Sequence, residues 1–316
     1  MNESLRILPQ ILVDGLVVGA LYAVVALGYT MVYGVLEFIN FAHSEIFMFG
    51  AFIGAEVFLV FKPAPGVPDF VPLVLGLLLA MVLAGALGWA VERIAYRPLR
   101  GAPRLVPLIS AIGVSFFLQD FARMIWTAVR GNWQLGTQDL YGGGIALMGA
   151  QIPVRSVLIM AIAIALMLAL SSFVNRSRTG KAMRAVAQDR ATAALMGIDV
   201  NQIISITFLL GGALGGAAGA LYTMQYTIVN PYIGFVMGIK AFTAAVFGGI
   251  GNITGAAVGG LCLGLFEALG SAYLGPLTGG VLVGSEYKDI IAFSLLILVL
   301  IFKPSGLLGE SGGEKV

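Results

Sequence analysis

The sequence predicts an all-α membrane protein with about eight transmembrane helices, in which the segment near residues 238–270 is broken or re-entrant. The first observation is composition: 59% of the 316 residues are hydrophobic and only 11% are charged, whereas a soluble domain carries about 25% charged residues. The second is that apolar runs of membrane-spanning length recur along the chain. The third is that basic residues gather in two of the connecting loops. Together they indicate one membrane domain covering residues 1–316.

Seven apolar runs approach the roughly 20 residues that a helix needs to cross a bilayer. They lie near residues 9–32, 46–61, 71–91, 105–127, 154–174, 203–224 and 286–302. The first run is too long for a cleaved signal peptide and has no small-residue cleavage site after a short core. We therefore expect it to remain as a span.

The eighth apolar region, residues 238–270, is longer than one span requires. It is interrupted in the middle by Gly248-Gly249-Ile250-Gly251-Asn252. Backbone groups freed at membrane depth must face protein or a cavity. The sequence therefore predicts a broken or re-entrant hairpin here.

The arginines predict the orientation, because loops rich in Arg and Lys stay on the cytoplasmic side. Half of the 18 basic residues lie in the loops 92–104 and 175–200, which we therefore expect to be cytoplasmic. The region 128–153 is Gly-rich and nearly neutral, and we expect it on the other side, with Trp126, Trp133 and Tyr141 as interfacial aromatics. The C-terminal tail should be cytoplasmic. The side of the N-terminus stays open, because it depends on whether residues 238–270 cross twice.

Composition also excludes several kinds of site. A single cysteine, Cys262, cannot form an internal disulfide or a cysteine-based metal cluster. A single histidine, His43, cannot build a multi-histidine metal site or supply a catalytic cluster, so we expect neither a metal site nor an enzyme. The net charge of +2 is too small to indicate nucleic acid binding.

The glycines recur at helix-packing spacing. Gly211, Gly215 and Gly219 fall at every fourth position, and Gly251, Gly255 and Gly259 repeat the pattern. Such stripes of small residues let membrane helices approach closely. The spacing fits ordinary packing between helices, or alternatively a substrate path lined by small residues.

Residues 177–199 form the segment with the most functional information. Its alanines and charged residues favour helix, and Gly197 suits the left-handed residue that ends a helix. Asp189 is placed to cap a second short turn that runs to Met196. Such an amphipathic element suits a helix that docks on a cytoplasmic partner, or alternatively an interfacial helix on anionic lipid.

The stretch from Ala187 to Gly197 resembles the "EAA" loop of bacterial ABC importer permeases, although the strict Glu-Ala-Ala is absent. Motifs along the whole chain are similar to those of branched-chain amino acid permeases of the LivH type. They are Asp14–Leu16, Gly19–Ala23, Leu27–Val35, Phe38–His43, Gly238–Val246, Gly248–Asn252 and Glu286–Asp289. One position departs from the family pattern, since Ser44 stands where a glycine usually follows Asn-Phe-Ala-His.

The resemblance implies a permease subunit of an ATP-driven importer of leucine, isoleucine or valine in the bacterial inner membrane. It also implies partners: a second permease of the LivM type, two ATP-binding subunits of the LivG and LivF type, and a periplasmic amino-acid-binding protein. The present chain has no phosphate-binding loop motif, so ATP and Mg²⁺ would be bound by the partner subunits. The residues expected to couple to the ATPase are Gly180, Arg184, Ala187, Gln188, Asp189, Ala193 and Gly197.

Polar residues within or beside the predicted spans are candidates for the pathway, because ionisable groups in a membrane are costly. They are Asn40, His43, Glu56, Thr243, Asn252, Thr254 and Glu267. His43 either orients a gating turn or is a structural residue at a helix end. Asp120 and Arg123 are three apart on one helix and are expected to neutralise each other. Asp14 and Lys240 are expected at the solvent edge.

The main alternative is an ion-coupled secondary transporter or channel for small amino acids or amides. Glu56, Glu267 and the broken segment fit that class. The elaborate basic loop at residues 175–200 argues against it, because a self-sufficient carrier does not require such a loop.

Overall fold

The computed structural model describes residues 7–61, 68, 70–103, 105–137, 141–147, 150–277 and 288–309. The longer helices are α2 (Leu8–Leu36), α3 (Ala42–Phe61), α4 (Phe70–Val91), α5 (Leu105–Arg130), α6 (Val154–Arg176), α9 (Val200–Gln225), α10 (Ile233–Gly248), α11 (Ile253–Leu277) and α12 (Lys288–Phe302). The shorter helices are η1 (Glu92–Tyr96), η2 (Arg97–Leu99), α7 (Arg178–Gln188) and α8 (Arg190–Leu195). The strands are β1 (Leu135–Gly136), β2 (Gly144–Leu147), β3 (Ala150–Pro153) and β4 (Ile228–Val229).

Within the described residues, seven helices are long and apolar enough to cross a membrane: α2, α3, α4 with its extension to Leu99, α5, α6, α9 and α11. They confirm the predicted all-α membrane fold. The apolar helix α10 is shorter, with 16 residues, and α12 has 15 described residues. Helix α10 overlaps the predicted apolar region 238–270, and α12 lies in the predicted apolar run 286–302.

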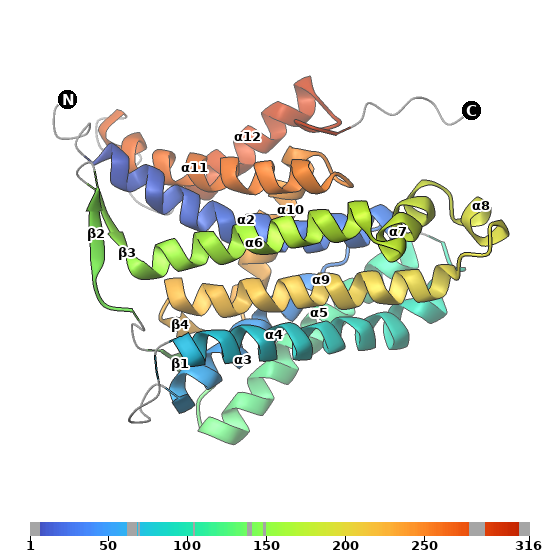
Figure 1. The fold of residues 1–316 in the computed structure, drawn as a ribbon, viewed down its shortest axis with the longest axis horizontal. Coiled ribbons are helices and arrows are strands. Elements are labelled where there is room, and N and C mark those ends of the chain that lie inside the picture. The colour runs from blue at the N-terminus through green and yellow to red at the C-terminus, as the bar shows by residue number, and fades with distance from the viewer. Residues whose placement is uncertain are drawn as a thin grey trace.

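The helices run side by side and their connections gather at two ends (Figure 1). The strands lie at one end, here called the strand end, and α7 and α8 lie at the other, here called the basic end. The backbone N–H of Gln151, in β3, donates to Gln10 at the start of α2 (2.9 Å), so α2 begins at the strand end. If the basic end is cytoplasmic, as the arginines predict, α2 therefore begins on the outer side.

Glycines set the close spacing between helices. Gly264 of α11 lies against the backbone of Gly19 in α2, and Gly216 of α9 lies against the backbone of Ala80 in α4. A Cβ at either glycine would overlap that backbone. Apolar helices in lipid associate mainly through close packing and hydrogen bonds. These close contacts therefore stabilise the helix bundle. Within the predicted stripes, Gly219 lies against the backbone of Phe47 in α3 and Gly259 against that of Ala244 in α10, which confirms the packing reading at these positions.

The predicted break in the eighth apolar region is confirmed. Helix α10 ends at Gly248, and α11 begins at Ile253. Gly249 and Gly251 have φ of +111° and +92°, which favours residues without a Cβ. The two helices form a hairpin, since Gly255 and Gly248 are in direct backbone contact.

The chain after α12 closes the break. The backbone N–H groups of Leu307 and Leu308 donate to the carbonyl oxygens of Phe247 and Gly248 at 2.8 and 2.9 Å. These bonds satisfy carbonyl groups at the end of α10 that would otherwise lack partners.

Two small antiparallel sheets add to the all-α fold at the strand end. Strand β1 pairs with β4, and β2 pairs with β3. The sequence predicts only a long Gly-rich loop there, because strands of two to four residues carry little periodicity. Trp126 is 8% exposed and stacks on Phe52 at 4.2 Å between ring centroids, and its predicted place at the membrane interface stays a prediction.

The core lies mainly in α2, α3 and α9, whereas α5 exposes a row of large apolar side chains. They are Ile109, Ile112, Phe116, Phe117, Phe121 and Met124. The same helix exposes Asp120 and Arg123, whose charged atoms are 4.0 Å apart. An apolar surface that also carries charged groups within a membrane helix is typical of a face that meets another protein.

Candidate functional site

The coupling element, residues 177–199, is anchored by its first turn. The Ser177 hydroxyl accepts a hydrogen bond from the N–H of Gly180 (2.8 Å) and caps α7. Gly180 lies so close to the backbone of Phe173 and Val174 that a Cβ would overlap it. Met183 and Val186 are buried. Helix α7 is therefore packed firmly on the end of α6 rather than free on the surface.

The second helix of the coupling element ends in an exposed apolar tip. Asp189 accepts from the N–H groups of Ala191 (2.8 Å) and Thr192 (3.1 Å), which confirms the predicted cap. Gly197 has φ of +82°, which confirms the predicted left-handed end. Between them, Leu195 and Met196 are 87% and 78% exposed. Two adjacent apolar side chains therefore project from residues 189–197, here called the corner, which Asp189 caps at its start and Gly197 ends.

A hydrogen bond joins this corner to the first membrane helix. Arg190 Nε donates to the carbonyl oxygen of Val35 near the end of α2 (2.9 Å). A small cavity of about 70 Å³ lies between α7, the end of α2 and the break, lined among others by Gly34, Arg184, Ala187 and Gly251. The coupling element thus contacts α2 directly and faces the broken segment across this cavity.

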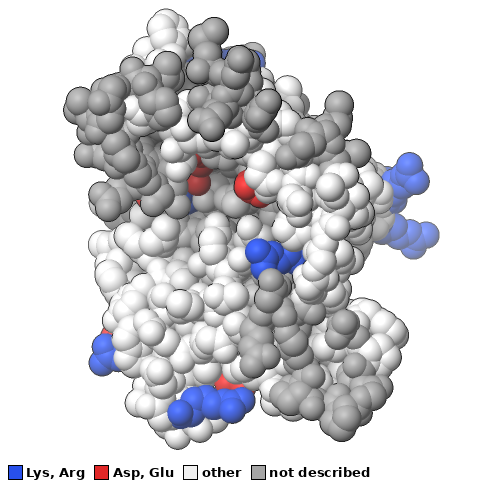
Figure 2. Space-filling view, turned by 90° about the vertical axis from the view of Figure 1, so that its left-hand side faces the viewer, with Lys and Arg blue, Asp and Glu red and all other residues white. Residues whose placement is uncertain are grey.

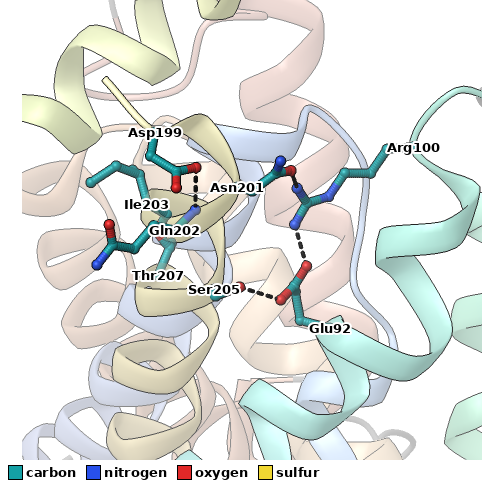
Figure 3. Close-up of polar contacts among 8 residues, drawn as sticks. All are labelled: Glu92, Arg100, Asp199, Asn201, Gln202, Ile203, Ser205 and Thr207. Atoms are coloured by element: carbon teal, nitrogen blue, oxygen red, sulfur yellow. Dashed lines mark hydrogen bonds and ion pairs between the residues drawn. The ribbon is translucent and has the colours of Figure 1, made fainter. Parts of the chain in front are cut away.

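A polar network fixes the start of α9, the helix that follows the coupling element (Figure 3). Arg100 donates to Glu92 and to the amide oxygen of Asn201. The Ser205 hydroxyl donates to the other oxygen of Glu92 (2.6 Å). Burial lowers the pKa of Arg100, and the charge of Glu92 opposes that shift. Asp199 caps α9 by accepting from Gln202 N–H (3.1 Å), so the two basic loops meet at one end of the molecule, as predicted.

A buried charge cluster joins four helices nearer the strand end. Lys240 Nζ lies 3.1 Å from Glu267 Oε1 and 2.6 Å from Asp289 Oδ1. The Tyr22 hydroxyl donates to Glu267 Oε2 (2.8 Å). Lys240 is only 5% exposed, so the predicted solvent-edge position is wrong. Two carboxylates, from α11 and α12, pair with Lys240 inside the protein, as a buried charge requires.

A cavity of about 300 Å³ adjoins this cluster and is lined by Tyr22, Tyr222, Tyr226, Tyr232 and Lys240 among others. Burial and the charge of Glu267 raise the pKa of the Tyr226 phenol. Figure 2, which looks on to the strand end, shows that the described part of this face is mostly uncharged, with acidic and basic atoms visible near its middle.

Glu56, near the C-terminal end of α3, pairs with two residues of α5. It accepts a hydrogen bond from Trp126 Nε1 (3.0 Å) and forms an ion pair with Arg130 of α5. These contacts fasten α3 to α5. A role of Glu56 in the pathway stays a prediction.

Asn40 and His43 lie at the junction of α2 and α3. Asn40 Oδ1 accepts from the Tyr96 hydroxyl (2.7 Å). His43, in the first turn of α3, is 1% exposed, and its ring fills the space beside Gly28, 4.7 Å from the ring centroid of Tyr29. This placement fits a structural residue at a helix end, although a gating role is untested.

The polar residues around the break bond mainly to the protein itself. Asn252 donates to the carbonyl oxygen of Leu308 (2.8 Å) and accepts from Gly255 N–H (2.9 Å). Thr243 donates to the carbonyl oxygen of Ile239 (2.8 Å), and Thr254 is exposed. Contact of these residues with a substrate stays a prediction.

Comparison with known proteins identifies the family. Residues 11–300 match the model of the family described as "Branched-chain amino acid transport system / permease component". The chain belongs to this family. The resemblance seen in its motifs is thereby confirmed, and the chain is a transport permease.

Three relatives illustrate the range of similarity. The permease is 45% identical to the "high-affinity branched-chain amino acid transport system permease protein BraD" of Pseudomonas aeruginosa and 41% identical to the LivH protein of Salmonella typhimurium. Both alignments cover 100% of each chain. It is also 26% identical to the "probable branched-chain amino acid transport permease protein LivM" of Methanocaldococcus jannaschii, over 74% of this chain and 68% of that one.

Some residues of interest were not among the sequence candidates. Leu195 and Met196 escape notice because they are ordinary helix formers, and the only signal is two apolar residues directly before the capping Gly197. Glu45 is 0% exposed, yet the sequence places it simply beside His43. Ser44 lies inside α3 and donates to the carbonyl oxygen of Phe41 (2.6 Å), so the departure from glycine requires no unusual backbone in the permease.

Proposed function

We propose that this permease forms one half of the pathway of an ATP-driven importer that carries leucine, isoleucine or valine across the bacterial inner membrane. A second permease of the LivM type would form the other half. Two ATP-binding subunits of the LivG and LivF type would bind at the basic end, and a periplasmic amino-acid-binding protein would deliver substrate at the strand end. ATP and Mg²⁺ would be bound by the ATP-binding subunits.

The observation that carries this proposal is the exposed tip of the coupling element. Leu195 and Met196 are exposed at the end of α8, which lies at the basic end (Figure 1), and an apolar knob on a short helix suits a groove on a partner protein. The alternative, a helix lying on lipid, would favour an apolar face along the length of α7. Instead, Met183 and Val186 of α7 are buried against the bundle.

The contacts of the coupling element supply a route for movement. A push on α8 would reach α2 through the bond between Arg190 and Val35. The break lies beyond a small cavity that α7 also lines, so a displaced α7 could move against it. Rigid elements that move together in this way suit a change between outward-open and inward-open states.

A second permease would fit the outward face of α5. That face combines large exposed apolar side chains with the exposed charges of Asp120 and Arg123. The similarity to a LivM protein supports a partner of related fold, as in other transporters whose two halves enclose the substrate site.

The test is to co-express the permease with the candidate partner subunits and to purify the complex through a tag on the permease. Wild type and a Leu195→Ser/Met196→Ser double variant are compared with Lys181→Ser, an exposed residue of α7. The proposal predicts that the tip variant loses the ATP-binding subunits and the ATPase activity stimulated by leucine-loaded binding protein. Lys181→Ser should retain both. Retention of both by the tip variant would contradict docking through this corner.

A further inference from the structure

A cavity of about 200 Å³ lies between the start of α3, the middle of α5 and the first half of α10. Its wall is almost entirely apolar, with Phe41, Ile112, Phe116, Phe235, Ile239 and Phe242 among the lining residues. The polar side chains that line it include Ser44, Ser115 and Gln119. A small apolar pocket with a few converging polar groups is the usual form of a ligand site.

A buried carboxylate lies directly behind the two serines. Glu45 is 0% exposed, and its Oε1 atom is 3.0 Å from the Ser115 hydroxyl and 3.5 Å from the Ser44 hydroxyl. Within the described part of the chain, its other oxygen has no hydrogen-bond partner. The described residues also form no ion pair with it. A buried carboxylate normally has a cationic partner, because an uncompensated buried charge is costly.

The start of α10 lies against this carboxylate. Gly234, in the first turn of α10, lies beside Glu45, and a Cβ there would be 2.6 Å from Oε2. The N-terminus of α10 has no side-chain cap. The positive end of a helix dipole attracts an anion, so this position suits a carboxylate, yet no described residue supplies Glu45 with a cation.

We propose that this cavity binds a branched-chain amino acid during transport, with Glu45 as the negative charge for the substrate ammonium group. The hydroxyl oxygens of Ser44 and Ser115 would accept from the ammonium group, and the apolar wall would enclose the aliphatic side chain. Gln119, one helical turn beyond Ser115, offers an amide N–H to the substrate carboxylate. The inference rests on the proposed function, since the rim residues Phe116 and Phe235 are exposed on the side where the second permease would enclose the pathway.

The charge cluster at Lys240 is a weaker candidate for this role. Its lysine already contacts two carboxylates and one of these also receives the Tyr22 hydroxyl. Glu45 has only hydroxyl partners among the described residues. A substrate cation therefore gains more at Glu45.

The test measures radiolabelled leucine binding to the permease complex in lipid nanodiscs without the binding protein. Two fragments of leucine act as competitors: 3-methylbutylamine keeps the ammonium group, and 4-methylpentanoate keeps the carboxylate. Because the amine alone can pair with Glu45, it should compete at least ~10-fold more strongly, the effect of about one charge-assisted hydrogen bond. Equal competition would show an apolar or acyl-chain pocket and would overturn the proposal.

Two variants test the charge of the site and its volume separately. Glu45→Gln keeps the shape and the serine contacts, and it should weaken leucine binding by ~10-fold or more and remove the preference for the amine. Ile112→Trp should fill the cavity and abolish binding. The matched control is Asp14→Asn, an exposed carboxylate of α2, which should bind as wild type does.

The remaining outcomes also decide the matter. Wild-type binding in either Glu45→Gln or Ile112→Trp would overturn the proposal, and so would the absence of saturable leucine binding by wild type. ATPase stimulation by leucine-loaded binding protein is measured in the same preparations. If wild type shows no ATPase stimulation, the proposed importer function is contradicted. If wild type shows stimulation but no leucine binding in the cavity, only the proposed binding site is contradicted.

Discussion

Arg190 of the coupling element donates through Nε to the carbonyl oxygen of Val35, 2.9 Å away, at the end of the first membrane helix. This contact joins two segments that lie far apart in the sequence. It is a charge-assisted hydrogen bond, which is stronger than a neutral one. It therefore gives α8 a direct mechanical connection to α2.

Replacing Arg190 should uncouple ATP hydrolysis from transport. Arg190→Ala removes the hydrogen bond that joins α8 to α2, at a cost of about one charge-assisted hydrogen bond, and we expect leucine uptake to fall about tenfold. ATPase activity of the assembled complex should persist, because the exposed tip is untouched. The control is Arg178→Ala, an exposed arginine at the start of α7. Equal uptake by the two variants would contradict the proposed connection.

Gly197 should be required for the shape of the tip but not for folding. Its φ of +82° disfavours a side chain, although a Cβ there would meet nothing within 4 Å. Gly197→Val should therefore cost only about 1–3 kcal/mol of local strain while displacing Leu195 and Met196 and abolishing uptake. Gly101→Val serves as the control, since Gly101 lies in the other basic loop and also has no neighbour within 4 Å. Normal transport by Gly197→Val in a well-folded complex would contradict docking through this corner.

The buried cluster at Lys240 should dominate the stability of the α10–α11 hairpin. Lys240→Met leaves Glu267 and Asp289 without their cation, and removing one partner of a buried pair costs about 3–5 kcal/mol. Denaturant titration of the purified permease in detergent should show that loss. Arg123→Met is the control, because its pair with Asp120 is exposed and is expected to contribute less than about 1 kcal/mol. Similar losses in the two variants would mean that the Lys240 cluster is largely hydrated.

Because α2 and α11 pack closely at Gly264, alanine there should destabilise the permease, whereas alanine at Gly113 should not. Gly264→Ala would force a Cβ into the backbone of Gly19, and overpacking of this kind costs about 1–3 kcal/mol. Gly113→Ala, on α5 with nothing within 4 Å, should be neutral or stabilising by up to about 1 kcal/mol, because alanine favours helix. The same denaturant titration measures both. A neutral Gly264→Ala would show that the two helices separate more easily than their spacing implies.

Local sequence patterns were sufficient to predict much of this structure. The membrane helices follow from apolar length, the break follows from the glycines between Gly248 and Asn252, and the corner follows from Asp189 and Gly197. Each of these features depends on neighbours within a few residues. The same locality explains why capping and helix ends were predicted correctly.

The features that local patterns did not reveal depend on residues distant in sequence. Lys240 looks like a surface lysine until Glu267 and Asp289 are brought to it by α11 and α12. Glu45 looks like the polar start of a helix until α5 and α10 enclose it with Ser115 and Gly234. Neither position carries a local signal, because burial there results from tertiary packing.

The most direct test of the account is leucine uptake into proteoliposomes that contain either the permease alone or the complete complex with its partner subunits. With binding protein outside and ATP available to the ATP-binding subunits, we predict uptake only by the complete complex, and loss of that uptake in the Leu195→Ser/Met196→Ser variant. Uptake by the permease alone under an ion gradient, without nucleotide or partners, would contradict the account.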